Sequence, residues 1–139
     1  MKTDLQLSTH ISKRYNAELE EVRSLVAQMG ELVLQQAQEG VQSIVNLDNE
    51  LAVKIIKNDE KVNDFEIKID EACTHILATR QPAASDLRMI VCVIKVVTDL
   101  ERMGDEAIKL GRNAIKINNS ENSCRAFVEL RNLGEKVTT

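Results

Sequence analysis

One apolar seam constrains the fold of this chain more than any other feature. From about residue 9 to residue 46, apolar side chains recur at steps of three and four residues, which places them on one face of an α-helix. At 1.5 Å per residue, such a helix is a rod of roughly 55 Å. Composition agrees, because 2% aromatic residues, one Pro and no Trp are typical of helical rods and bundles. The seam comprises Tyr15, Leu19, Val22, Val26, Met29, Val33, Ala37, Val41 and Ile44.

Two further seams predict two more long helices. The stretch "NLDNE" interrupts the pattern with Asp48 as a candidate N-cap, and a second seam then runs from Leu51 to Ile76. It ends in "TRQPAASDLR", because the residue before Pro82 is pushed out of helical geometry while Pro suits the first turn of the next helix. The third helix extends to about Ile117, which makes the chain all-α.

A polar linker and a short fourth helix are expected after the third. The stretch "NNSENS" is typical of a linker, and residues 125–137 again have a helical pattern. "VAQMGELV", which starts at Val26, resembles "LRNLGEKV", which starts at Leu130, so a sequence repeat restarts here. We therefore predict one bundle at residues 1–118, and at 119–139 a linker with the first helix of a truncated second repeat.

Charge and hydropathy exclude several classes of protein. The formal net charge is −4 and Lys and Arg do not cluster, so the electrostatic footprint of a nucleic-acid-binding protein is missing. No window approaches the ~18 apolar residues of a membrane span, and the N-terminus has no apolar signal region. We expect a cytoplasmic protein. Cys73, Cys92 and Cys124 are interpreted as buried thiols.

Carboxylates on two helices form stripes without basic neighbours. On the second helix the stripe steps by four, three and four residues, and no Lys or Arg lies three or four residues from any member. On the third helix Glu101 also lacks such a neighbour, whereas Asp105 has only Arg102 and Lys109. By contrast, Glu60 and Asp64 have several Lys neighbours and form an ordinary solvated face. The second-helix stripe is Asp59, Asn63, Glu66 and Asp70.

The two stripes meet if the second and third helices form an antiparallel hairpin through Pro82. Asp59 is then level with Asp105, and Asn63 with Glu101, while Glu66 and Asp70 lie nearer the turn. A hard multivalent cation held by oxygen ligands would offset the repulsion, and carboxylates can also bridge two ions. The sequence predicts such a metal site; the alternative is a wet acidic groove that holds only monovalent counterions.

Catalytic patterns are missing from the sequence. Diiron bundles use Glu-x-x-His pairs, and here His10 lies at the N-terminal end while His75 is five residues beyond Asp70, off its helix face. His75 is interpreted as a surface or helix-end side chain. No phosphate-binding Gly-rich loop, Ser-His-Asp set or Cys-His pair is visible, so we expect no enzyme activity.

Three motifs carry a resemblance to a known family. "QPAASDLR" and "LERMGDEA", preceded by "VNDFEIKIDEAC", resemble the PhoU family over nearly the whole chain. The resemblance implies two similar three-helix bundles in tandem, with multinuclear iron or zinc clusters at Glu/Asp-x-x-x-Asp motifs. Glu101 and Asp105 match that motif; Asp59 and Asn63 match it except that Asn replaces an acid; Glu66 and Asp70 match its spelling nearer the turn. Manganese and magnesium are alternative metals.

The resemblance also implies a cellular role. Proteins of this kind are cytoplasmic adaptors between the phosphate ABC transporter, including its ATPase subunit, and a membrane sensor histidine kinase, and they repress phosphate-starvation genes. Contact with the membrane would be indirect, through these partners. The alternative is a metal-storage or redox bundle without a signalling role. Because the chain resembles a first repeat plus the opening helix of a second, we interpret it as an N-terminal fragment.

Two structural expectations complete the sequence analysis. Arg88 and Arg102 are expected to form ion pairs that hold the hairpin of the second and third helices in register. On the fourth helix an apolar stripe is expected to dock on another copy of the chain, which would make a homodimer. That stripe comprises Phe127, Leu130, Leu133 and Val137.

Overall fold

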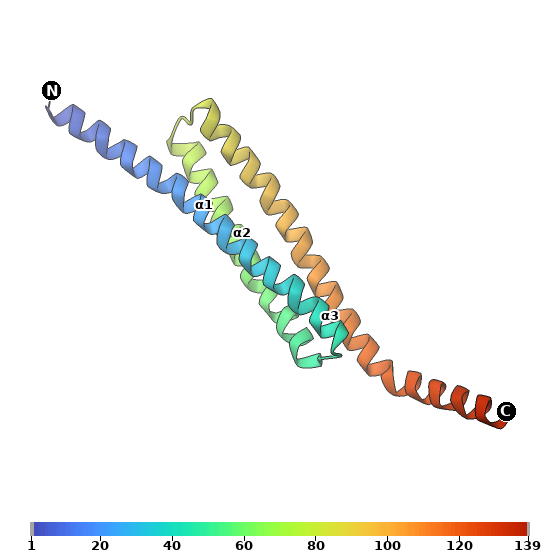
Figure 1. The fold of residues 1–139 in the computed structure, drawn as a ribbon. Coiled ribbons are helices and arrows are strands. Elements are labelled where there is room, and N and C mark those ends of the chain that lie inside the picture. Colours follow the sequence, from blue (N-terminus) through green and yellow to red (C-terminus); the bar gives the residue numbers. More distant parts are fainter. Residues whose placement is uncertain (1, 139) are drawn as a thin grey trace.

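Three long helices make up the fold, as the seams predict. The computed structural model describes the backbone of residues 2–138 and the side chains of residues 4–120. Helix α1 spans Lys2–Val45, α2 spans Asn49–Thr79 and α3 spans Ala84–Thr138. Each helix packs against both others, and α2 runs antiparallel to α1 and α3 (Figure 1). The prediction of an all-α antiparallel three-helix bundle is confirmed.

Most residues of the predicted seams are buried and form the core. Leu19, Val22, Met29 and Val33 of α1 are at most 5% exposed. Burial of such side chains contributes about 1.5–3 kcal/mol each. The partners from the other two helices in this cluster are Val62, Ile69, Cys73, Ile76, Ile90, Val93 and Val97.

The α1 seam shifts after Val33. The prediction continued it through Ala37 and Val41, but Val41 is 54% exposed, and the polar side chains of Gln36 and Ser43 are buried instead. Gly40 also faces inward, because a Cβ there would lie 3.3 Å from Leu110 of α3. Close approach of α1 and α3 therefore favours a small residue, and the polar Gln36 enters the core beside it.

Both turns of the hairpins follow the predicted signals. Asp48 is the N-cap of α2, and its carboxylate accepts a hydrogen bond of 3.1 Å from the Leu51 amide. Leu47 just before it has a φ of 51°, the left-handed conformation. At the other end α2 stops at Thr79, and α3 begins two residues after Pro82. The N-cap and the Pro-containing turn therefore set the two ends of α2.

The predicted linker at 119–124 is not a break in the helix. Helix α3 continues from Ala84 to Thr138, so the separate helix at 125–137 is instead part of α3. The stretch contains no Gly or Pro, and Asn and Ser disfavour a helix only weakly. The assignment of residues 119–139 to a second repeat stays a prediction. The apolar stripe from Phe127 to Val137 and Cys124 lie outside the side chains that the structure describes.

The bundle is longer than its core. In Figure 1 the first turns of α1 and the last turns of α3 extend beyond the other helices at opposite ends. On the α1 extension Leu5, Leu7 and Ile11 are 70%, 55% and 52% exposed. Within the described residues, no helix is long and apolar enough to cross a membrane.

Candidate functional site

The predicted carboxylates lie along the surface junction where α2 and α3 pack together, which we call the α2–α3 groove. On α2, the buried side chains of Val62 and Ile69 point into the core, and the stripe of Asp59 and Glu66 follows the edge of that buried face. On α3, Glu101 lies at the corresponding edge. These three carboxylates are half-buried, whereas the other predicted site residues, namely Asn63, Asp70 and Asp105, are exposed.

Glu101 is the electrostatic centre of the groove. Its pKa is raised to about 7, first by a side-chain hydrogen bond with Glu66 and then by burial. The negative charges of Glu66, Asp105 and Asp59 raise it further. A carboxyl group with this pKa holds a proton near neutral pH for a large part of the time. The proton relieves the repulsion that the sequence predicted.

Asp59 and Asp105 form a second acidic contact in the groove. Burial raises the pKa of Asp59, and the charge of Asp105 raises it further, while Arg112 opposes both effects. Among the described side chains, none of the ion pairs includes Asp59, Glu66, Asp70, Glu101 or Asp105. Among the described residues the acidic stripes therefore meet without an ion pair to a basic side chain, and the charge of Arg112 only partly offsets the effect on Asp59.

The pairing within the groove differs in one respect from the prediction. Asp59 interacts with Asp105 as expected, but the partner of Glu101 is Glu66 and not Asn63. Side chains lean toward the N-terminus of their own helix. Because α2 and α3 are antiparallel, Glu66 and Glu101 lean toward each other. Pairing residues only by the height of their backbones along the hairpin does not predict the contact between Glu66 and Glu101.

A buried amide lies behind the acidic groove. Gln36 of α1 is 1% exposed, and neither its Nε2 nor its Oε1 has a hydrogen-bond partner among the described residues. A Cβ placed on Gly104 would lie 3.9 Å from Gln36 Oε1 and 3.9 Å from Asp59 Oδ1. The missing side chain at Gly104 thus leaves an amide and a carboxylate near one another. Burial of unpartnered polar atoms costs about 1–3 kcal/mol.

The carboxylate and amide oxygens are suitable ligands for a hard cation, but they are not arranged around a single point as ligands of a bound ion are. Carboxylate and amide oxygens are the ligands that hard multivalent cations prefer. Within residues 4–120, however, no group of three or more His, Cys, Asp or Glu side chains is arranged so that it could hold a metal ion. The chemistry of Asp59, Glu66, Glu101 and Asp105 fits a cation, and their side chains would have to converge to bind one.

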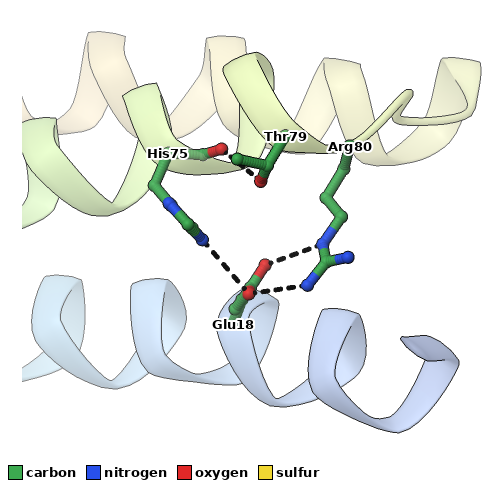
Figure 2. Close-up of polar contacts among 4 residues, drawn as sticks. All are labelled: Glu18, His75, Thr79 and Arg80. Carbon is green, nitrogen blue, oxygen red and sulfur yellow. Dashed lines mark hydrogen bonds and ion pairs between the residues drawn. The ribbon is translucent and has the colours of Figure 1, made fainter. Parts of the chain in front are cut away.

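A second polar cluster lies at the α2–α3 turn, and sequence reasoning missed it. Arg80 donates two hydrogen bonds to Glu18 of α1, Nε to Oε2 at 3.2 Å and Nη2 to Oε1 at 3.0 Å. His75 Nε2 lies 3.4 Å from Glu18 Oε1, so one carboxylate contacts both basic side chains (Figure 2). The pKa of Glu18 is lowered, chiefly by the hydrogen bond from Arg80.

The turn has a further link to α1. Tyr15 donates a hydrogen bond of 2.9 Å from its hydroxyl to Asp86 Oδ2 at the start of α3. Tyr15 and Glu18 are three residues apart on one edge of α1, and this spacing was a usable signal. Together they attach the turn of "TRQPAASDLR" to α1.

Of the smaller expectations, two are wrong and one agrees with the structure. Among the described side chains, no ion pair involves Arg88 or Arg102, so neither holds the hairpin in register. Cys73 is buried as predicted, but Cys92 is exposed, because it lies on the outer face of α3. His75 has a side chain that is 56% exposed, in agreement with its interpretation as a surface residue.

The fold and site define a class: an all-α bundle of long amphipathic helices with a carboxylate-lined groove. A family profile described as "PhoU domain" matches residues 26–114. The chain belongs to the PhoU family.

Curated relatives share this assignment. The chain is 49% identical over 131 residues to the "Phosphate-specific transport system accessory protein PhoU homolog" of Pseudomonas putida, covering 94% of this chain and 51% of the relative. It is 46% identical over 112 residues to the "Phosphate-specific transport system accessory protein PhoU" of Escherichia coli (strain K12), covering 81% of this chain and 46% of the relative. The chain thus spans about half the length of the curated relatives it matches.

Solved structures of the family have the same arrangement of helices. The crystal structure of PhoU from Pseudomonas aeruginosa matches with a TM-score of 0.76 and 47% identity, over 88% of this chain and 59% of that chain. The phosphate transport system regulatory protein PhoU from Streptococcus pneumoniae matches with a TM-score of 0.68 and 31% identity, over 73% of this chain and 48% of that chain.

Proposed function

We propose that this chain acts in a cytoplasmic regulatory adaptor of phosphate homeostasis. In this role it represses the phosphate-starvation response and links the phosphate ABC transporter, through its ATPase subunit, to the membrane sensor histidine kinase. The observation that carries the proposal is the 49% identity over 94% of the chain to a phosphate-specific transport accessory protein. The role requires binding surfaces and not catalysis, which agrees with a rod of long helices that have exposed outer faces.

A regulatory metal site in the α2–α3 groove is part of the proposal. Asp59, Glu66, Glu101 and Asp105 would hold iron or zinc, or alternatively manganese or magnesium, as one ion or a cluster. A bound cation would supply positive charge where the carboxylates otherwise share protons. The closeness of these carboxylates supports this assignment, since among the described side chains none of them forms an ion pair with a basic residue.

Deletion of the encoding gene tests the adaptor role. We expect constitutive expression of a phosphate-starvation reporter in phosphate-rich medium, restored to repression when the gene is supplied in trans. Normal repression in the deletion strain would contradict the proposal. If repression is normal while cellular iron or zinc content falls, the alternative of a metal-storage or redox bundle, which the acidic groove also favours, gains support.

Self-association is a separate part of the proposal. The expected contact lies on the C-terminal segment of α3, in the apolar stripe from Phe127 to Val137. Light scattering over a concentration series would compare the chain with a version that ends at Asn119. A monomeric parent, or a truncated chain that dimerises equally well, would contradict this contact.

A further inference from the structure

A small space bordered by all three helices lies at Gly104 of α3. A Cβ placed on this buried glycine would lie 3.9 Å from Gln36 Oε1 of α1 and 3.9 Å from Asp59 Oδ1 of α2. Val62 Cγ1, at 3.7 Å, would be its apolar neighbour. These are ordinary contact distances, so the missing side chain leaves room for a group about the size of a methyl. Oxygen atoms from two different helices border this room, which we call the Gly104 space.

The amide of Gln36 needs a partner in this space. Its side chain is 1% exposed, and neither Oε1 nor Nε2 has a hydrogen-bond partner among the described residues. Ser43, the other buried polar side chain described on α1, instead donates to the Gly40 carbonyl at 2.7 Å. Buried polar groups in proteins are normally satisfied by protein, water or an ion. Because Oε1 borders the Gly104 space, a small group bound there would satisfy it.

Charge identifies the kind of group that fits. Asp59 is half-buried, Asp105 follows Gly104 in the sequence, and no ion pair of described side chains includes either carboxylate. A water molecule would satisfy the amide oxygen but would leave the negative charge of the carboxylates in place. A hard cation satisfies both, since amide and carboxylate oxygens are its preferred ligands.

The carboxylates need an additional ligand to complete a cation site. Among residues 4–120, no group of three or more His, Cys, Asp or Glu side chains is arranged so that it could hold a metal ion. Gln is outside that set of residue types, and the amide oxygen of the buried Gln36 approaches from the interior of the bundle. Asp59 and Asp105 approach from the surface junction of α2 and α3. An ion between them would therefore have ligands on two sides.

We propose that Gln36 is a ligand of the cation that the α2–α3 carboxylates bind, and that the ion reaches its amide oxygen in the Gly104 space. The carboxylates by themselves join only α2 and α3, whereas Gln36 adds a ligand from α1. Binding of one ion would then connect all three helices and fix the position of α1 against the hairpin. The inference deepens the metal site of the proposed function and rests on it.

Gly104→Ala tests the space without disturbing the fold. The added Cβ meets no atom of another helix closer than 3.7 Å, and Ala forms helix better than Gly, so the thermal midpoint in EDTA should not fall. The methyl group occupies the space, so the affinity of the metal-free protein for Mn²⁺ should fall about tenfold or more, as it does when residues that support a metal ligand are removed. Titration followed by the electron paramagnetic resonance signal of free Mn²⁺ gives the affinity.

Two substitutions at Gln36 test the ligand itself. Gln36→Met keeps a similar shape but has no oxygen, so Mn²⁺ binding should weaken about tenfold or more. Gln36→Glu restores an oxygen ligand, so it should bind Mn²⁺ at least as tightly as the wild type. Its buried charge should lower the thermal midpoint in EDTA. A ligand gives weak binding with Met and tight binding with Glu, whereas a packing residue would favour the uncharged Met.

Matched substitutions elsewhere on the bundle control for helix propensity and for buried polarity. Gly30→Ala is also a change within a long helix, and a Cβ there meets nothing within 4 Å. Ser43→Ala removes the other buried polar side chain described on α1. Both should change the Mn²⁺ affinity by less than about twofold. Circular dichroism confirms that every variant is folded.

Hydrogen exchange tests whether the ion fixes α1. Saturating Mn²⁺ should slow the exchange of α1 backbone amides near residue 36 in the wild type, because bound metal opposes local opening of the helix that it contacts. The same concentration should give no such protection in Gln36→Met, whose remaining ligands lie on α2 and α3.

Three outcomes overturn the inference. Equal Mn²⁺ affinity in the wild type, Gly104→Ala and Gln36→Met would show that α1 supplies no ligand, while the carboxylate site of the proposed function would stand. A folded Gln36→Glu variant that binds no better than Gln36→Met would show that the oxygen atom is not the determinant. If the wild type does not bind Mn²⁺, the metal site of the proposed function fails together with the inference. The reporter assay tests the adaptor role separately.

Discussion

Two polar clusters on the same bundle handle charge in opposite ways. At the α2–α3 turn, Glu18 accepts two hydrogen bonds from Arg80, and its pKa is lowered. In the middle of the groove, Glu101 faces Glu66, and its pKa is raised to about 7. Both clusters join residues from different helices, but only the first is electrostatically complete. A carboxylate that is paired with basic side chains stabilises the fold by itself. Carboxylates that face one another are suited to an external cation.

Metal binding gives the largest expected difference between the clusters. Glu101→Ala with Asp105→Ala should abolish tight binding of iron, zinc or manganese, because it removes both α3 carboxylates from the groove. Elemental analysis before and after chelation provides the measurement. The double mutant should keep near wild-type helicity, because it also removes like-charge repulsion. Glu18→Gln is the matched carboxylate change at the turn and should leave metal content unchanged; equal metal content in the double mutant would refute the groove as a site.

Thermal stability should respond to the turn cluster. Arg80→Ala leaves the half-buried Glu18 carboxylate without its bidentate partner, so we expect the midpoint of thermal unfolding to fall by several degrees. Arg23→Ala is the control, since Arg23 pairs with Glu20 three residues away on an exposed surface of α1. Exposed pairs of this kind contribute little. Circular dichroism measures the unfolding midpoints. Equal midpoints for the two variants would contradict the structural role that we assign to the turn.

The pH dependence of stability should have opposite signs in the two clusters. Glu101 has a folded-state pKa of about 7 against an ordinary value of 4.5, so between these values the folded state binds more protons than the unfolded state. Its contribution is then fully present at or below pH 4.5 and is lost as the pH rises to 7. Glu18 has a lowered pKa, so its contribution is present above its ordinary pKa and is lost as the pH falls through the folded value.

Urea unfolding in EDTA across pH 4.5–7.5 measures this difference. Glu101→Gln should flatten the decline in stability toward neutral pH, with a slope change of at most about 1.4 kcal/mol per pH unit for one proton. The Glu18→Gln variant should retain the decline. An unchanged slope in Glu101→Gln would show that Glu101 is not the group responsible.

The smallest expected effect concerns the buried amide behind the groove. Gln36→Met keeps a similar shape and removes two unpartnered polar atoms, so the free energy of unfolding should rise by about 1 kcal/mol. Ser43→Ala is the comparison, because the Ser43 hydroxyl already donates to the Gly40 carbonyl at 2.7 Å. It should be neutral or destabilising. Loss of stability in Gln36→Met would mean that the amide has a stabilising role in the acidic cluster.

The sequence by itself determined the elements of this fold. Helical periodicity and turn chemistry act over a few residues, so the seam from Tyr15 to Val33, the N-cap at Asp48 and the break at Pro82 were all readable. Helix propensity is also local, but the linker predicted at 119–124 is wrong, because polar residues alone do not end a helix and α3 continues through this stretch. The proximity of Asp59 and Asp105 followed from the hairpin register.

Only the tertiary structure decided which side chains meet. The pairing of Glu66 with Glu101, the link from Arg80 to Glu18 and the burial of Gln36 depend on axial shift, side-chain lean and the distance between helices. These quantities are set by how three helices pack together, and contacts such as Gly40 against Leu110 determine them. A sequence pattern places a residue on a helix face, but it does not contain the position of the neighbouring helix.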